Sequence, residues 1–138
     1  MNEINIPYHL LIPSLISLLF SLLLILVYWK WRYKIRRKSL WLSLIVFFVT
    51  YAFFVGIAFY DDISIQIRLN TFDLNHDGLF TGNEITKEQK IVFGKLINDT
   101  GRNMIVFFAI ILSGISSIFT FVISNGYFHY LKLKQAEK

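Results

Sequence analysis

The chain has 138 residues, of which 55% are hydrophobic and 17% are charged. Its mean hydropathy of +0.54 exceeds that of most soluble domains of this size. The formal net charge at pH 7 is +5, and the absence of cysteine excludes disulfides, thiolate metal sites and cysteine nucleophiles. The composition indicates one small domain associated with a membrane.

Three runs without Asp, Glu, Lys or Arg are long enough to cross a bilayer. They cover residues 4–29, 39–60 and 103–131, and a spanning helix needs about 20 mainly apolar residues. The first run is preceded by an acid and no base and is too long for a secretory signal peptide. The predicted fold is all-α, an integral membrane protein with three transmembrane helices at residues 4–29, 40–60 and 103–129.

The charges between these runs predict an orientation. Residues 30–39 carry six bases and no acid, the C-terminal tail at residues 130–138 is also basic, and residues 61–102 hold seven acids and five bases. Short basic segments stay on the cytoplasmic side of a membrane. We therefore expect a multi-pass protein of the cell (inner) membrane, with residues 30–39 and 130–138 inside and the N-terminus and residues 61–102 outside.

The basic run at residues 30–38 has two possible partners, nucleic acid and lipid headgroups. Three membrane spans already account for the run as a topology signal, and basic segments beside a span attract anionic headgroups. The sequence therefore predicts membrane lipid as a partner and no nucleic acid.

The segment between the second and third spans contains a regular series of oxygen donors. Asp73, Asn75 and Asp77 place side-chain oxygens at every second residue, Gly78 follows, and Glu84 closes the series. A hard divalent cation needs six or more oxygen ligands, which a short loop supplies only with such a rhythm.

This series resembles the calcium-binding loop of the EF-hand family, over the loop and its flanks at about residues 63–97. The resemblance implies a calcium site in which most ligands are side-chain oxygens, Leu79 offers its backbone carbonyl and Glu84 binds in bidentate fashion. The implied metal ligands are Asp73, Asn75, Asp77, Leu79, Thr81 and Glu84. We therefore expect one extracytoplasmic EF-hand unit at residues 61–102, with calcium as its ion.

Two other interpretations compete with this one. Thr81 and Glu84 have the spacing of a helix capping box, so the loop could be an acidic turn followed by a cap. A cap alone does not require the earlier donors. In addition, isoleucine or leucine alternates with polar residues over 63–69, which is typical of a strand, but the loop resemblance favours a helix there.

EF-hands normally occur in pairs, and the sequence shows one loop. The missing partner is a degenerate loop, a second copy of this chain or another subunit. Entering and exiting helices that continue into the second and third spans would link the ion to membrane geometry.

Hydroxyl side chains follow one face of the first and third spans. They are Ser14, Ser17 and Ser21 in the first, and Ser113, Ser117, Thr120 and Ser124 in the third. The second span has a small-residue step at Ala52 and Gly56. Close helix packing explains these patterns, and a hydrated path through an oligomer is the alternative. None of the spans has near its centre the ionisable residue that a proton relay or transporter site needs; His9 and His129 lie near the membrane edges.

No catalytic constellation is visible in the sequence. We therefore predict a non-enzymatic calcium-binding membrane protein, a calcium-sensing or calcium-stabilised accessory subunit of a larger membrane complex. The expected partners are other membrane subunits or further copies of the chain. The alternative is a small homo-oligomeric channel gated by external calcium.

Overall fold

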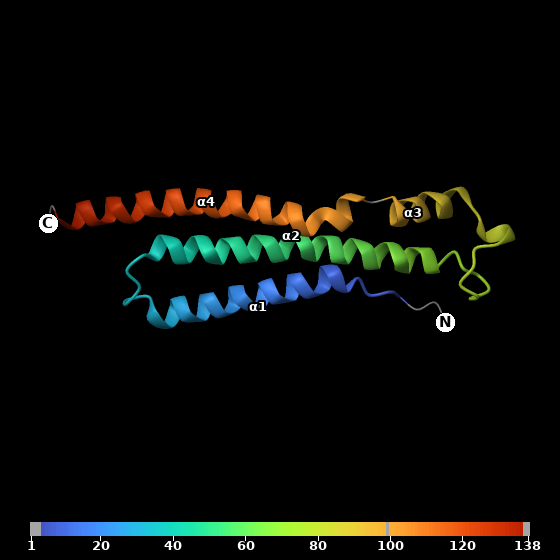
Figure 1. Ribbon diagram of the computed structural model, residues 1–138, viewed down its shortest axis with the longest axis horizontal. Helices are drawn as coiled ribbons and strands as arrows, with labels where there is room; N and C mark the ends of the chain where they lie inside the picture. Colours follow the sequence, from blue (N-terminus) through green and yellow to red (C-terminus); the bar gives the residue numbers. More distant parts are fainter. Residues whose placement is uncertain (1–3, 99, 137–138) are drawn as a thin grey trace.

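The computed structural model describes residues 4–98 and 100–136, with the side chains of all of these except residues 83 and 103. Its elements are α1 (Tyr8–Trp31), α2 (Lys38–Asn70), the short 3-10 helix η1 (Gly82–Glu84), α3 (Lys87–Ile97) and α4 (Thr100–Ala136) (Figure 1). Three helical stretches are long and apolar enough to cross a membrane: α1, α2 and the Met104–Ala136 part of α4. The prediction of an all-α chain with three such helices is confirmed.

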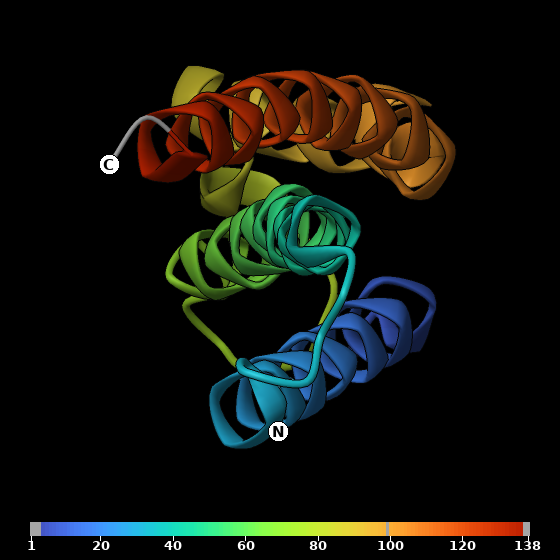
Figure 2. The same cartoon turned by 90° about the vertical axis from the view of Figure 1, so that its left-hand side faces the viewer.

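The three long helices form a row with α2 in the middle. Viewed end on, α4 lies on one side of α2 and α1 on the other (Figure 2). Because the helices lie in a row, both broad faces of α2 remain open. Less than a fifth of the most apolar stretch of each helix is buried within the chain, 17% in α1, 17% in α2 and 11% in α4.

A small apolar core holds the row together near the end that carries the N-terminus. Leu10 of α1, Val55 of α2 and Ala109 of α4 are all fully buried. Tyr51 and Phe54 pack against this cluster. Small side chains such as Ala109 let neighbouring helices approach closely. Within a bilayer, where lipid tails are as apolar as the helices, dispersion contacts would hold these surfaces together.

The hydroxyl residues also lie in contacts within the chain. The side chain of Ser17 in α1 donates to the carbonyl of Phe48 in α2 at 2.8 Å. From the other side, Ser117 of α4 donates to the carbonyl of Ser43 at 2.9 Å. Ser14, Ser21 and Ser113 are buried as well. These observations favour packing over a polar path as the explanation of the two stripes.

In the small-residue step of the second span, Gly56 faces open space. A Cβ atom added at Gly56 would meet no heavy atom within 4 Å. No described neighbouring segment therefore packs against the Cβ position of Gly56.

Helix α2 is continuous from the second span to the loop. It includes residues 63–69, so the helical interpretation of that stretch is confirmed and the strand alternative is wrong. Its 33 residues make a rod of about 50 Å, against about 30 Å for the hydrocarbon core of a bilayer. Helix α2 is therefore longer than one bilayer crossing requires.

The exiting helix α3 does not continue into the third span. Helix α3 ends at Ile97, and the separate helix α4 begins at Thr100. Asn98, Thr100 and Gly101 are poor helix formers, which accounts for a break here. At the other end α4 remains helical to Ala136, while residues 137 and 138 of the predicted tail lie outside the described residues.

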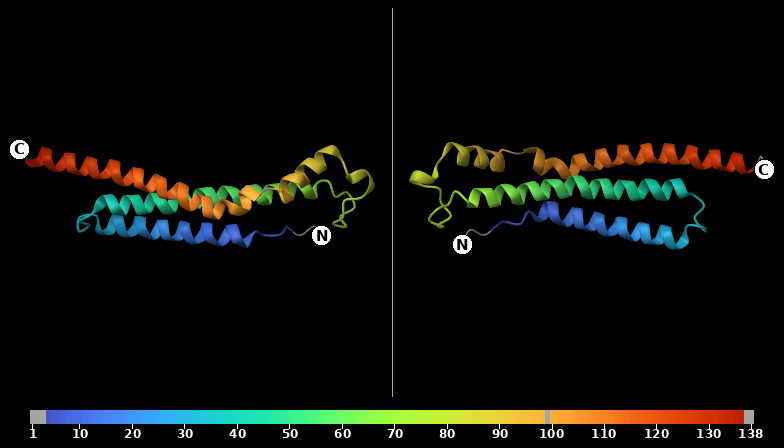
Figure 3. Two further views of the ribbon diagram at one scale, coloured as in Figure 1. Left: turned by 45° about the horizontal axis from the view of Figure 1, so that its top comes forward. Right: turned by 180° about the vertical axis from the view of Figure 1, so that it is seen from behind.

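The chain distributes its polar segments to opposite ends of the row. The connection between α1 and α2 and the end of α4 lie at one end, and the N-terminal segment and the loop between α2 and α3 lie at the other (Figures 1 and 3). The two basic segments of the sequence therefore share one end, which is called the basic end below.

Candidate metal centre

The loop between α2 and α3 begins where α2 ends at Asn70 and continues to Thr86, the N-cap of α3. Three of its residues have positive φ angles, 60° at His76, 81° at Gly78 and 53° at Gly82. Glycine adopts this conformation without steric cost. The two glycines therefore allow the chain to reverse direction within a few residues.

Each of the first three predicted ligands uses one side-chain oxygen to hold the loop. Oδ2 of Asp73 accepts from the amide of Gly78 at 2.9 Å. Oδ1 of Asn75 accepts from the amide of Asp77 at 3.0 Å, and Oδ1 of Asp77 accepts from the amide of Leu79 at 2.7 Å. The Asn75 and Asp77 bonds are turns in which a side chain bonds the backbone two residues on, and the Asp73 bond closes a longer stretch of five residues.

Glu84 ties the two ends of the loop together. Its Oε1 accepts from the amides of Leu74 and Asn75 at 2.8 and 3.2 Å, and its Oε2 accepts from the amide of Thr81 at 3.0 Å. The Thr81 side chain in turn accepts from the amide of Glu84, which completes a capping box at η1. The predicted capping-box contact of Thr81 and Glu84 is thus confirmed.

The six predicted ligands differ in burial. Asp73 and Glu84 have exposed fractions of 2% and 6%, whereas Asn75, Asp77, Leu79 and Thr81 lie on the surface of the loop. Within the part of the chain that the structure describes, no three His, Cys, Asp or Glu side chains are grouped closely enough to hold a metal ion. The loop thus buries the carboxylates of Asp73 and Glu84 and leaves the other four predicted ligands on its surface.

The donor chemistry of the loop suits a hard cation. All side-chain donors among the predicted ligands are oxygens, three of them from carboxylates, and none is a nitrogen or sulfur. Calcium takes six to eight oxygens in flexible geometry. The donor set therefore fits calcium, provided that the Glu84 carboxylate releases its backbone amides and turns to the ion.

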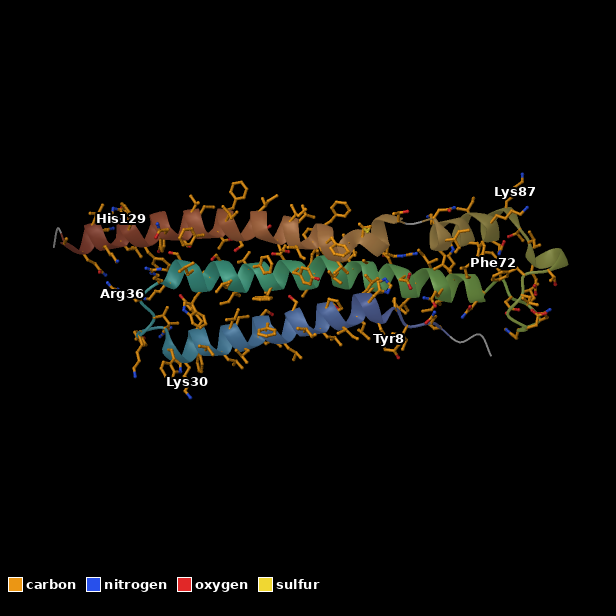
Figure 4. All side chains as sticks on the ribbon, viewed as in Figure 1. Tyr8, Lys30, Arg36, Phe72, Lys87 and His129 are labelled. Carbon is orange, nitrogen blue, oxygen red and sulfur yellow. The ribbon has the colours of Figure 1, made fainter. Side chains whose placement is uncertain are left out.

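Aromatic and aliphatic contacts join the loop to its flanking helices. The rings of Phe80 and Phe93 meet edge to face, with centroids 6.2 Å apart, and Leu69 and Val92 are buried. A cleft of about 770 Å³ lies between the end of α2 and α3, with Ile65 and Ile91 among its lining. Phe72 and Lys87, at the two margins of the loop, mark its position in Figure 4.

A polar network near the membrane boundary was not predicted from the sequence. The guanidinium of Arg102 in α4 lies 3.1 Å from the carboxylate of Asp62 in α2, and their side chains are 4% and 13% exposed. Gln66 donates to Asp62 at 2.6 Å and exchanges two hydrogen bonds with the backbone of Asn5. The network thus joins the N-terminal segment, α2 and α4.

Arg102 also holds the end of α3. Its Nη2 donates to the carbonyls of Leu96 at 3.0 Å and Lys95 at 3.5 Å. Carbonyls in the last turn of a helix lack intrahelical partners and carry the negative end of the helix dipole, so a guanidinium is a suitable cap. The helix that follows the loop is therefore attached through one side chain to both α2 and α4.

Comparison with known proteins gives no relative. No protein-family model matches the chain, and no curated protein or solved structure matches it. The case for a function therefore depends on the geometry of the chain itself.

Proposed function

We propose that this protein is a non-enzymatic calcium-binding membrane protein that serves as a calcium-sensing or calcium-stabilised accessory subunit of a larger membrane complex. The observation that carries the proposal is the loop at residues 73–84. It has oxygen donors at the spacing of an EF-hand loop, and the side chains of Asp73, Asn75 and Asp77 accept hydrogen bonds from its backbone amides. Calcium, as the ion, would neutralise three carboxylates that repel one another in a short segment.

The same contacts suggest how the ion would act. Glu84 now accepts from backbone amides at both ends of the loop. Ligation would exchange these hydrogen bonds for the ion and move the start of η1 and α3. The far end of α3 is fixed to α4 by Arg102, so a change in the angle between α2 and α3 would reach the membrane helices. EF-hand sensors respond to calcium through such angles.

The surface of the chain supports a role within a complex. Outside the spans, the loop and α3 expose Leu74 at 71%, Leu79 at 65% and Ile91 at 62%. A partner that packed on the loop and α3 would bury these apolar side chains. The partner is another membrane subunit or a second copy of the chain, which would also supply the second EF-hand.

The orientation is part of the proposal. The basic connection between α1 and α2 and the basic end of α4 lie together (Figure 1), as the positive-inside rule requires of two cytoplasmic segments. With the basic end in the cytoplasm of a cell (inner) membrane, the calcium loop and the N-terminus face outward.

The alternative of a calcium-gated channel draws less support. A channel would use the hydroxyl stripes of the first and third spans. Ser17 and Ser117 of these stripes donate to backbone carbonyls of α2 in the same chain. These two hydroxyls therefore face α2 and not a pore, while Thr120 and Ser124 of the same stripes donate to carbonyls of α4 itself.

The decisive test is calcium titration of the detergent-purified protein by calorimetry, with two matched variants. Glu84→Gln removes the proposed bidentate ligand, and Glu88→Gln makes the same change at an exposed position in the first turn of α3. Loss of an outer-shell partner alone lowers metal affinity about 10–100-fold. We therefore expect Glu84→Gln to weaken binding at least tenfold and Glu88→Gln to leave it nearly unchanged.

Two results would contradict the proposal. One is the absence of binding by the unaltered protein at millimolar calcium, and the other is equal binding by both variants. Hydrogen exchange of α3, measured with and without calcium, then separates the two forms of the proposal. Faster or slower exchange beyond the loop indicates a sensor, and a change confined to the loop indicates a structural ion.

A further inference from the structure

A cleft of about 800 Å³ opens at the basic end of the chain. Its walls come from three segments distant in sequence: the connection between α1 and α2, the first turn of α2 and the last turns of α4. Figure 4 shows Arg36 on the connection and His129 on α4 at this end of the row. Helix α4 runs past the connection here, as Figure 3 shows from two sides.

The rim of the cleft is strongly cationic. Arg36, Arg37, Lys38 and Lys132 line it, and none of its lining residues is acidic. Helix α2 starts in the same place, and its N-cap residue Arg37 makes no side-chain cap hydrogen bond. The positive end of the α2 dipole therefore adds to the potential of the four bases. The chemistry of the rim selects an anion.

Apolar side chains line the cleft beside the bases. They include Leu40, Phe121 and Phe128, which belong to the two charge-free runs at residues 39–60 and 103–131. The ammonium of Lys38 lies 6.0 Å from the centre of the Phe128 ring, so basic and apolar lining residues adjoin. A phosphate with attached acyl chains matches both kinds of residue, while a soluble phosphate matches the bases alone.

We propose that this cleft binds the phosphate of an anionic phospholipid headgroup in the adjoining leaflet. The cations hold the phosphate, and the first carbons of the acyl chains lie against the apolar lining residues. Basic pockets between transmembrane helices bind anionic headgroups in this way. The site is independent of the calcium loop, which lies at the other end of the row.

The neighbouring bases offer a matched control. Lys34 belongs to the same connection and Lys134 to the last turn of α4, and neither lines the cleft. The ammonium of Lys34 lies 5.4 Å from the centre of the Trp31 ring. Lys30, in the last turn of α1, is also outside the cleft.

The test measures lipid retention by native mass spectrometry of the full chain, released from nonionic detergent with added phosphatidylglycerol or phosphatidylcholine of equal chain length. Two variants each lose three positive charges. The cleft variant combines Arg36→Gln, Arg37→Gln and Lys132→Gln, and the control variant combines Lys30→Gln, Lys34→Gln and Lys134→Gln. We expect the unaltered chain to prefer phosphatidylglycerol, the cleft variant to lose at least about tenfold in affinity, and the control variant to lose less than about threefold.

Two results would overturn the proposal. Equal losses in the two variants would mean diffuse attraction of lipid to a basic surface. Displacement of the lipid by soluble glycerol phosphate at comparable concentration would mean a soluble phosphate ligand. Far-UV circular dichroism checks the helix content of each variant. If the cleft variant loses helix, the single change Lys132→Gln at an exposed position replaces it, with Lys30→Gln as its control.

Discussion

The ion pair between Asp62 and Arg102 allows the attachment of α3 to the membrane helices to be tested directly. Replacement of Arg102 by Leu removes the guanidinium that lies 3.1 Å from Asp62 and that caps the carbonyl of Leu96. Asp62 then remains as a carboxylate with an exposed fraction of 13%. Because the opposite charge is gone, the variant should be less stable.

The magnitude follows from what remains around Asp62. Breaking a buried pair by removing one partner costs about 3–5 kcal/mol, because a buried charge is left without compensation. Gln66 still donates to Asp62 at 2.6 Å, and the carbonyl of Leu96 gains access to water once the side chain is shortened. We therefore expect the lower end of the range, a loss of about 3 kcal/mol in the free energy of unfolding.

Unfolding by SDS in mixed micelles, followed by far-UV circular dichroism, measures this loss. The set of proteins is the unaltered chain, Arg102→Leu, Asp62→Leu and the double variant. Replacing both partners of a buried pair by apolar residues is often neutral, so the double variant should recover at least about 1 kcal/mol relative to the sum of the single changes. Hydrogen exchange should also be faster in α3 of Arg102→Leu.

The control for this experiment is Lys95→Met. Arg102 contacts the backbone carbonyl of Lys95, so loss of the Lys95 side chain should change stability by no more than about 0.5 kcal/mol. If Arg102→Leu is as stable as the control, or the double variant is additive, then the pair does not hold α3 and the structural argument for coupling fails.

Further substitutions test the loop and the helix contacts. Gly78→Ala forces a non-glycine residue to a φ of 81° and should cost about 1–2 kcal/mol, seen as weaker binding in a calcium titration. Gly56→Ala places a methyl group in open space and should raise the free energy of unfolding in SDS by up to about 1 kcal/mol. Ala109→Leu enlarges a fully buried side chain and should lower it by about 1–3 kcal/mol. Ser117→Ala removes the hydrogen bond to Ser43 and should cost about 0.6 kcal/mol in the same assay.

The spans were predictable because each is a long run without charge, and no soluble arrangement buries three such runs in so short a chain. The local hydrogen bonds of the loop were also within reach of the sequence. An Asn or Asp followed two residues later by a free backbone amide forms its turn with no help from the rest of the fold. The capping box of Thr81 and Glu84 is local in the same sense.

The network around Asp62 was not predictable, because it depends on how the helices align. Asp62 and Arg102 are 40 positions apart, and which turn of α4 faces Asp62 is set by packing around Ala109 and Val55. The sequence does contain a partial signal, an acid just after one span and a base just before the next. The cleft at the basic end is hidden for the same reason, since Lys132 joins Arg36 only through the antiparallel arrangement of α2 and α4.

The two helices that flank the loop are attached to the row in different ways, and this difference gives the proposed calcium response its direction. Helix α2 is one continuous rod that is packed between α1 and α4, so its end is a fixed reference. Helix α3 is separated from α4 by a break, and Arg102 clamps its last turn. A force applied at Glu84 would therefore move α3 rather than α2. This movement of α3 would first displace Arg102 and Asp62. Through Gln66 it would then reach the segment before α1.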